Sequence, residues 1–191
     1  MVVVAGRHQL GPDRGRILLR TFRDGLAAQA GHDLIIEATR WSGVLGINED
    51  LSPAGLDVRI DMGALVVREG TGGIKPLSDR DRREIAVTAR KVLAADRNPE
   101  AVFTADAFEP AADGGGEISG TFTLRGQARP LRVRVTQTGA GRYHGEARVV
   151  QSDYGIKPYT GFLGALRVRD AVDVTVDLDL PEQAADSEAG S

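Results

Sequence analysis

The sequence predicts an all-β fold: a single antiparallel β-barrel of about eight strands, with one α-helix inserted between strands. Apolar and polar side chains alternate along most of the chain, for example over residues 56–62 and 172–180. Successive side chains of a strand point to opposite faces, so each such segment has one dry and one wet face. Many strands of this kind favour a sheet curled around a common interior. A chain of 191 residues fits one domain.

The first part of the chain alternates in four segments. Strands are expected at 16–22, 31–45, 56–62 and 64–68. Residues 24–30 are short and rich in Ala, which indicates a helical turn or a loop, and Trp41 lies near an expected bend. Pro53 and neighbouring turn residues predict a connection over 48–55. Residues 1–15 are expected to be an N-terminal extension, and 16–180 the barrel.

One segment changes to a helical period. Between residues 78 and 95 the apolar side chains are Ile85, Ala89, Val92 and Leu93. Their i, i+4, i+7, i+8 spacing predicts an amphipathic helix. Ser78, with an acidic residue three positions later, is expected to form an N-terminal capping box. The Asn-Pro pair at 98–99 is expected to return the chain to an extended conformation.

The alternation resumes after the helix. Strands are expected at 100–108, around 118–124 and 131–135 as a hairpin, at 142–151 and at 166–180. Three consecutive glycines at 114–116 predict a loop between the first two of these. Residues 181–191 are small, polar and acidic, so a disordered tail is expected.

Composition and charge exclude several classes of protein. The net charge is −3 and no basic run is interleaved with aromatic residues, so nucleic acid is not an expected partner. The chain has no cysteine, which excludes disulfides and thiolate chemistry. It lacks a signal peptide and an apolar run of about 20 residues, so no membrane insertion and a cytoplasmic location are expected. A homodimer is left open.

The residues show no enzyme signature. The three histidines have no metal-ligand spacing, no serine lies in G-x-S-x-G, and the glycines at 114–116 precede no phosphate-loop lysine. No catalytic residue, metal or cofactor is therefore expected. His32 lies on the apolar face of its strand. It is interpreted as a buried structural histidine, as a ligand contact, or as a base that would need a nearby carboxylate.

The inward faces carry the strongest functional signal, because they are almost free of polar groups. The expected inward residues are Ile17, Leu19, Leu34, Ile36, Val58, Ile60, Val67, Val102, Ile118, Phe122, Val133, Val135, Val149, Val174 and Val176. A barrel of about eight strands either fills its centre with side chains or holds one small ligand. Side chains of medium size leave room for an apolar ligand, yet the same walls can pack shut, giving a barrel that acts through its surface as a stress-related or scaffold protein.

Three motifs resemble the YceI-like family. The run from Ile118 to Val135, ISGTFTLRGQARPLRVRV, is similar to the family's hairpin, whose turn reads roughly L-H-G-x-T-R-P. Residues 98–103 (NPEAVF) resemble its Y-P-x-I-x-F. Residues 152–156 (SDYGI), with the alternation that follows at 168–176, resemble its late S-D-F-G-I stretch. The chain departs from the family at Arg125, where His is usual, and at Asn98, where an aromatic residue is usual.

The resemblance implies a lipocalin-like barrel that binds a polyisoprenoid, quinone or fatty-acid-like molecule without catalysis. The expected cavity lining is Leu34, Ile36, Val58, Ile60, Phe122, Val133, Val174 and Val176. The candidates at the mouth, which would meet a polar or anionic head group, are His32, Lys75, Lys157 and Tyr159. Both lysines lie in the same tetrapeptide, Gly-Ile-Lys-Pro, at 73–76 and 155–158. The repeat indicates either two similar turns or two cations at one rim.

Overall fold

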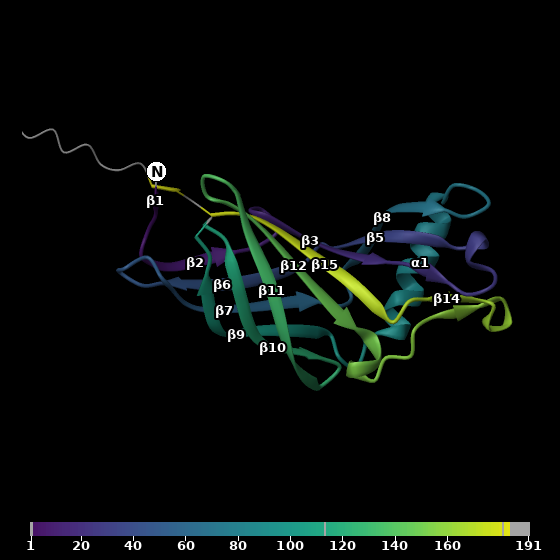
Figure 1. Ribbon diagram of the computed structural model, residues 1–191. Helices are drawn as coiled ribbons and strands as arrows, with labels where there is room; N and C mark the ends of the chain where they lie inside the picture. The colour runs from purple at the N-terminus through teal and green to yellow at the C-terminus, as the bar shows by residue number, and fades with distance from the viewer. Residues whose placement is uncertain (1, 113, 181, 184–191) are drawn as a thin grey trace, which may run out of the picture.

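The computed structural model describes residues 2–112, 114–180 and 182–183. Eleven antiparallel strands form one curled sheet in the order β2-β6-β7-β9-β10-β11-β12-β15-β3-β5-β8 (Figure 1). They are β2 (Gly6–Leu10), β3 (Gly15–Thr21), β5 (His32–Ala38), β6 (Trp41–Ile47), β7 (Pro53–Asp61), β8 (Leu65–Gly72), β9 (Glu100–Pro110), β10 (Gly116–Leu124), β11 (Gln127–Gly139), β12 (Arg142–Val150) and β15 (Ala171–Asp179).

Smaller elements lie at the two ends of this sheet. A three-stranded sheet joins β13 (Thr160–Gly161), β14 (Leu166–Val168) and β4 (Arg23–Asp24), and a two-stranded one joins β1 (Val2–Val3) and β16 (Glu182–Gln183). The helix is α1 (Asp79–Val92), and short 3-10 turns are η1 (Ala28–Ala30), η2 (Gln151–Tyr154) and η3 (Phe162–Gly164). The expected disordered tail lies outside the described residues, except for the β16 pair.

A shared corner divides two long stretches of chain. Residues 32–47 pair with residues 53–72 nearly throughout, first as β5 with β8 and then as β6 with β7. At the corner, the Thr39 amide donates to the Ala64 carbonyl at 2.9 Å, and the Asp61 amide donates to the Arg40 carbonyl at 3.0 Å. The single strand expected over 31–45 is therefore wrong. The corner raises the strand count above eight, and so does β2, which joins β6 from within the expected N-terminal extension.

The strand expected over 166–180 is also divided. Residues 166–168 form β14 in the small sheet, and β15 begins only at Ala171. Between them, Asp170 accepts hydrogen bonds from the Ser152 amide at 2.8 Å and the Ser152 hydroxyl at 2.5 Å. The Gln151 amide donates to the Asp170 carbonyl at 2.9 Å. These contacts tie the break to η2, which is why alternation alone does not reveal it.

Helix α1 has the predicted N-terminus. The Asp81 amide donates to the Ser78 hydroxyl at 3.2 Å, and the Ser78 amide donates to the Asp81 carboxylate at 2.9 Å. This reciprocal pair is the expected capping box. The helix packs on β8, with Ile85 and Ala89 turned toward the core. It therefore covers the end of the curled sheet where β5 begins and β8 ends (Figure 1).

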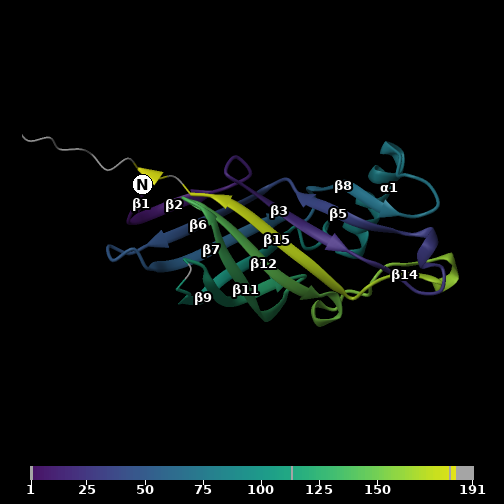
Figure 2. The same ribbon diagram turned by 45° about the horizontal axis from the view of Figure 1, so that its top comes forward.

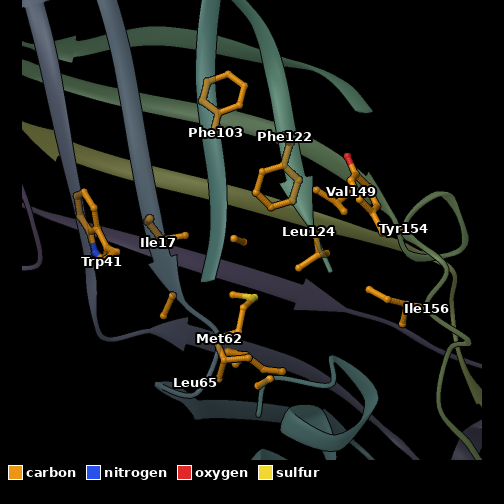
Figure 3. Packing of buried hydrophobic residues seen from close by; sticks show 14 of the residues in the cluster. Ile17, Trp41, Met62, Leu65, Phe103, Phe122, Leu124, Val149, Tyr154 and Ile156 are labelled. Carbon is orange, nitrogen blue, oxygen red and sulfur yellow. The ribbon is translucent and has the colours of Figure 1, made fainter. Parts of the chain in front are cut away.

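The packed part of the core gathers around the corner and the β9–β10 pair. Trp41, Met62, Leu65, Phe103 and Phe122 are buried there (Figure 3). The ring of Phe122 meets that of Tyr154 edge-on, with centroids 5.6 Å apart. Other inward residues, Val58, Val133 and Val174 among them, are only half-buried. The packed core is therefore a partial one.

Strand β9 corrects one expected inward residue. Val102 pairs with Arg59 and with Thr123, whose side chains belong to the outer face. The inward residues of β9 are instead Ala101, which is fully buried, and Phe103. Val102 and Phe103 are adjacent apolar residues on opposite faces, and alternation alone does not decide which of the two faces is dry.

The outer face carries an ion pair that links stability to pH. His144 Nδ1 lies 2.7 Å from Asp177 Oδ1 across the β12–β15 pair. This hydrogen bond raises the pKa of His144. A raised pKa in the folded state contributes stability at low pH that is lost as the pH rises through that pKa. We expect the urea midpoint to fall slightly from about pH 6 to about pH 9. The Asp177→Asn variant should show a smaller fall, and an equal fall in both proteins would contradict this assignment.

Candidate functional site

A cavity of about 1060 Å³ lies inside the curled sheet. This volume is at the upper end of the range for small-molecule sites, about 300–1,000 Å³. Alternate residues of β15 line the cavity from Val172 to Leu180. At about 3.3 Å per residue, that distance is about 26 Å. The cavity is therefore an elongated tube along β15.

The sequence-predicted wall residues all line this tube. They are Leu34, Ile36, Val58, Ile60, Phe122, Val133, Val174 and Val176. They come from strands β5, β7, β10, β11 and β15, which the curl of the sheet turns toward one another. Alternation predicts their inward direction because it is a local property of each strand. The inner face of α1, with Ile85 and Ala89, completes one side of the wall, and sequence reasoning did not include it.

The wall side chains are unevenly buried, and this difference locates the free space. Ile36 and Phe122 are buried. Val58, Val133 and Val174 are only half-buried, although they point inward from the middle of their strands. Their remaining exposed surface faces the cavity. An apolar surface that stays uncovered inside a protein is available to an apolar ligand.

Three of the four expected mouth residues, His32, Lys75 and Tyr159, line one end of the cavity. His32 Nε2 lies 2.9 Å from the Lys75 carbonyl oxygen, which fixes the loop of residues 73–77 over the start of β5. The apolar face of its strand predicts that His32 is buried, but its side chain is only half-buried. Lys75 and Tyr159 are exposed, so the cavity reaches the surface beside them.

Arg23 also lines this end, and sequence reasoning missed it. Its guanidinium donates to the Gly31 carbonyl at 2.9 Å and to the Thr71 carbonyl at 3.3 Å. A Cβ on Gly72 would lie 1.3 Å from the Arg23 Nη1. Glycine at residue 72, with φ of 82°, lets the chain pass close to the Arg23 guanidinium. An arginine at the end of a strand gives no sequence signal of such a contact.

Lys157 lies outside the cavity lining, although its loop has the same sequence as that of Lys75. It is exposed and follows Gly155, whose carbonyl accepts a hydrogen bond from Arg125 at 2.6 Å. Both Gly-Ile-Lys-Pro loops lie at the same end of the sheet, where β8 and β12 end. The structure therefore brings the two loops to one end, but only one lysine to the cavity.

The side chains at this end of the cavity include cations and hydrogen-bonding groups. The hydrogen-bond partner of His32 among the described residues is a carbonyl, not the carboxylate that a base would need. The described part of the chain contains no group of three His, Asp or Glu side chains placed to hold a metal ion. Its helices include none long and apolar enough to cross a bilayer.

The sequence and the fold of this chain both resemble those of known proteins. Residues 28–180 match the family model of YceI-like domains. The fold is similar to that of BcnA from Burkholderia cenocepacia, with a TM-score of 0.61, 15% identity, and coverage of 86% of this chain and 94% of that one. It is also similar to a Campylobacter jejuni YceI protein, with a TM-score of 0.58, 14% identity, and coverage of 78% and 85%.

A third solved structure is a polyisoprenoid binding domain from Saccharophagus degradans implicated in plant cell wall breakdown. It covers 93% of this chain and 99% of its own, with a TM-score of 0.55 and 13% identity. No curated protein sequence matches the chain. At these identities the solved structures establish a shared fold.

Proposed function

This chain belongs to the family of YceI-like domains, and we propose that its cavity binds one long apolar ligand of polyisoprenoid, quinone or fatty-acyl type without changing it chemically. The observation that carries the proposal is the apolar tube along the full length of β15. A long apolar tube suits a single chain better than a compact, polar metabolite. The polyisoprenoid-binding description of the Saccharophagus degradans domain agrees with this class of ligand.

In this proposal, the bent β5–β6 stretch connects the two edges of the sheet and so encloses the tube. β5 lies next to one edge strand of the sheet and β6 next to the other, yet only two residues separate them. In this proposal the sheet closes on itself at the corner. Counting β5–β6 and β7–β8 as single bent strands leaves nine strands, namely a barrel of eight and the short β2 beside β6. Such a barrel has room for one small ligand in its centre.

Apolar burial supplies the affinity. Each CH₂ group that leaves water contributes about 0.8 kcal/mol, so ten of them contribute about 8 kcal/mol before the cost of ordering the chain. Specific hydrogen bonds to the chain are unnecessary for this gain. The alternative, a filled barrel that acts through its surface, is disfavoured by the half-buried valines that face the cavity.

Competition for a fluorescent fatty acid tests the proposal. We expect the delipidated protein to bind the probe, and a polyprenol, a quinone or a long-chain fatty acid to displace it. A short, soluble carboxylate such as acetate should not displace it, because the gain depends on chain length. Absence of saturable probe binding, together with no displacement by any of the three lipids, would overturn the proposed function.

The two lysines make a matched pair for testing the head-group site. Lys75 lines the cavity and Lys157 does not. We expect Lys75→Ala to weaken binding of a fatty acid about threefold, the size of an exposed ion pair, and to leave a neutral polyprenol unaffected. Lys157→Ala should change neither. An equal loss in the two variants would place the head group elsewhere.

A further inference from the structure

We propose that the mouth end of the protein docks on a lipid bilayer with anionic head groups, through three loops at residues 25–32, 70–78 and 154–169, called the tip loops below. This surface surrounds one mouth of the cavity, and docking on a bilayer goes beyond the binding function proposed above. Figures 1 and 2 show all three loops at the end of the molecule that carries α1 and β14.

Each tip loop presents large apolar side chains to solvent. Leu26 is 101% exposed, Ile74 is 87% exposed, and Phe162 and Leu163 are 66% and 110% exposed. Side chains of this size are the ones most often found inside proteins. Their concentration on three adjoining loops, rather than singly over the surface, indicates an interaction site.

Direct contacts hold the three loops together. The Ala27 amide donates to the Ala165 carbonyl at 2.8 Å, which joins the first loop to the third. His32 and Arg23 bind carbonyls of Lys75 and Thr71, which joins the first loop to the second. The apolar side chains therefore belong to one assembled surface, although more than a hundred residues separate Leu26 from Phe162 in the sequence.

The backbone at the third loop is held in a costly conformation that exposes these side chains. Phe162 has φ of 47° and Leu163 has φ of 55°. Left-handed backbone is unfavourable for residues with a Cβ, and strained positions of this kind concentrate at ligand-binding and switch regions. Neither side chain gains burial within the chain in return, because both are exposed. Burial of these two side chains in a bound surface would offset the cost of the left-handed backbone.

Positive charge is concentrated on the tip loops themselves. The loops contain four cationic side chains, Lys75, Lys157, Arg167 and Arg169, and no Asp or Glu, although the whole chain has a net charge of −3. Six carboxylates flank the loops. Those of Asp24, Asp33 and Asp170 accept hydrogen bonds from Gly25, Arg23 and Ser152, and those of Glu69, Asp79 and Asp153 are exposed. Cations beside exposed apolar residues are the combination that peripheral proteins use on anionic bilayers.

The position of the cavity favours a bilayer over a protein partner. Lys75, Tyr159 and Arg167 line the cavity and are exposed on or beside the tip loops. A lipid leaving a bilayer beneath these loops would meet the cavity without crossing water. Single apolar residues at separate loop tips can enter a fluid surface independently, whereas a folded partner favours a continuous patch.

Vesicle flotation with the full chain tests this inference. We expect the protein to float with phosphatidylcholine–phosphatidylglycerol vesicles, less so with phosphatidylcholine alone, and less so at high salt. Joint Leu26→Ser, Phe162→Ser and Leu163→Ser substitutions should weaken vesicle binding at least about tenfold. These positions are exposed, so the melting temperature of the variant should match that of the unsubstituted protein.

Two further variants keep the test specific. Val87 is 52% exposed on α1 outside the tip loops, so Val87→Ser is the matched control and should bind vesicles normally. Lys157 lies on a tip loop but outside the cavity lining, so Lys157→Glu should lower the preference for anionic vesicles. Failure of the unsubstituted protein to float, or equal flotation of the triple-serine variant, would overturn the inference. An equal loss in Val87→Ser would do the same.

Failure of vesicle docking can be distinguished from failure of ligand binding in the cavity. The triple-serine variant should bind the fluorescent fatty acid in solution as tightly as the unsubstituted protein, because none of its three sites lines the cavity. Normal probe binding without vesicle binding in the unsubstituted protein would reject docking and leave the proposed function in place. Vesicle binding without saturable probe binding would reject the proposed function and leave docking in place.

Discussion

Val176→Trp is expected to weaken binding of a long apolar ligand at least about a hundredfold without destabilising the protein. Val176 lines the cavity from β15, opposite Gly145 on β12 and near Val133 on β11. An indole at this position would occupy the tube and exclude about four CH₂ groups, worth about 3 kcal/mol of binding. The same indole would bury apolar surface of its own, so the urea midpoint should stay constant or rise.

Stability separates the hollow barrel from the filled one in this experiment. In a filled core, the larger side chain would cost about 1–3 kcal/mol through overpacking. Thr175→Trp is the control, since residue 175 lies on the opposite face of β15 and outside the cavity lining. It should leave ligand binding intact. Unchanged binding in Val176→Trp would contradict the cavity assignment, and a large loss of stability would favour the filled barrel.

Gly120→Ala should destabilise the fold by about 3 kcal/mol or more. Gly120 lies at the irregularity in the β9–β10 pairing, where the register shifts between Ser119 and Gly120. A Cβ there would lie 2.3 Å from the Thr104 carbonyl oxygen and 2.9 Å from the Ala105 Cα. Both are backbone atoms of the paired strand, so relief requires that the β9–β10 ladder separate.

A second glycine provides the control for this effect. Gly55 on β7 has no atom within 4 Å of the position that a Cβ would take. Gly55→Ala should therefore change the free energy of unfolding by less than about 1 kcal/mol. Comparison of the two variants by urea denaturation isolates the steric contact from the general effect of alanine. Equal free energies in the two variants would show that the bulge does not need glycine.

The sequence predicts the inner wall of the sheet better than its connections. Alternation identifies the faces of β5, β7 and β15 because side-chain direction depends only on the neighbouring residues of a strand. The corner at residues 39–40 depends instead on hydrogen bonds to the Asp61–Ala64 turn, far along the chain. The break at residues 169–170 depends on Ser152 in the same way. Such partners leave no local pattern.

At the mouth of the cavity, too, contacts between distant segments decide positions that the local sequence does not predict. The two Gly-Ile-Lys-Pro loops are identical in sequence, but a hydrogen bond from His32 to the Lys75 carbonyl holds only the first of them at the cavity lining. Arg23 is held by carbonyls from two other segments, so its sequence position does not distinguish it from a solvated arginine. The amphipathic period predicts α1 and its cap, but the position of the helix over the end of the sheet comes from packing on β8.

Native mass spectrometry with organic extraction, on protein purified from the cells that make it, tests the central claim most directly. The account predicts a discrete adduct that extracts as a lipid or quinone and disappears in Val176→Trp. A mass equal to that of the bare chain, unchanged after incubation with isoprenoid and fatty-acyl mixtures, would contradict it.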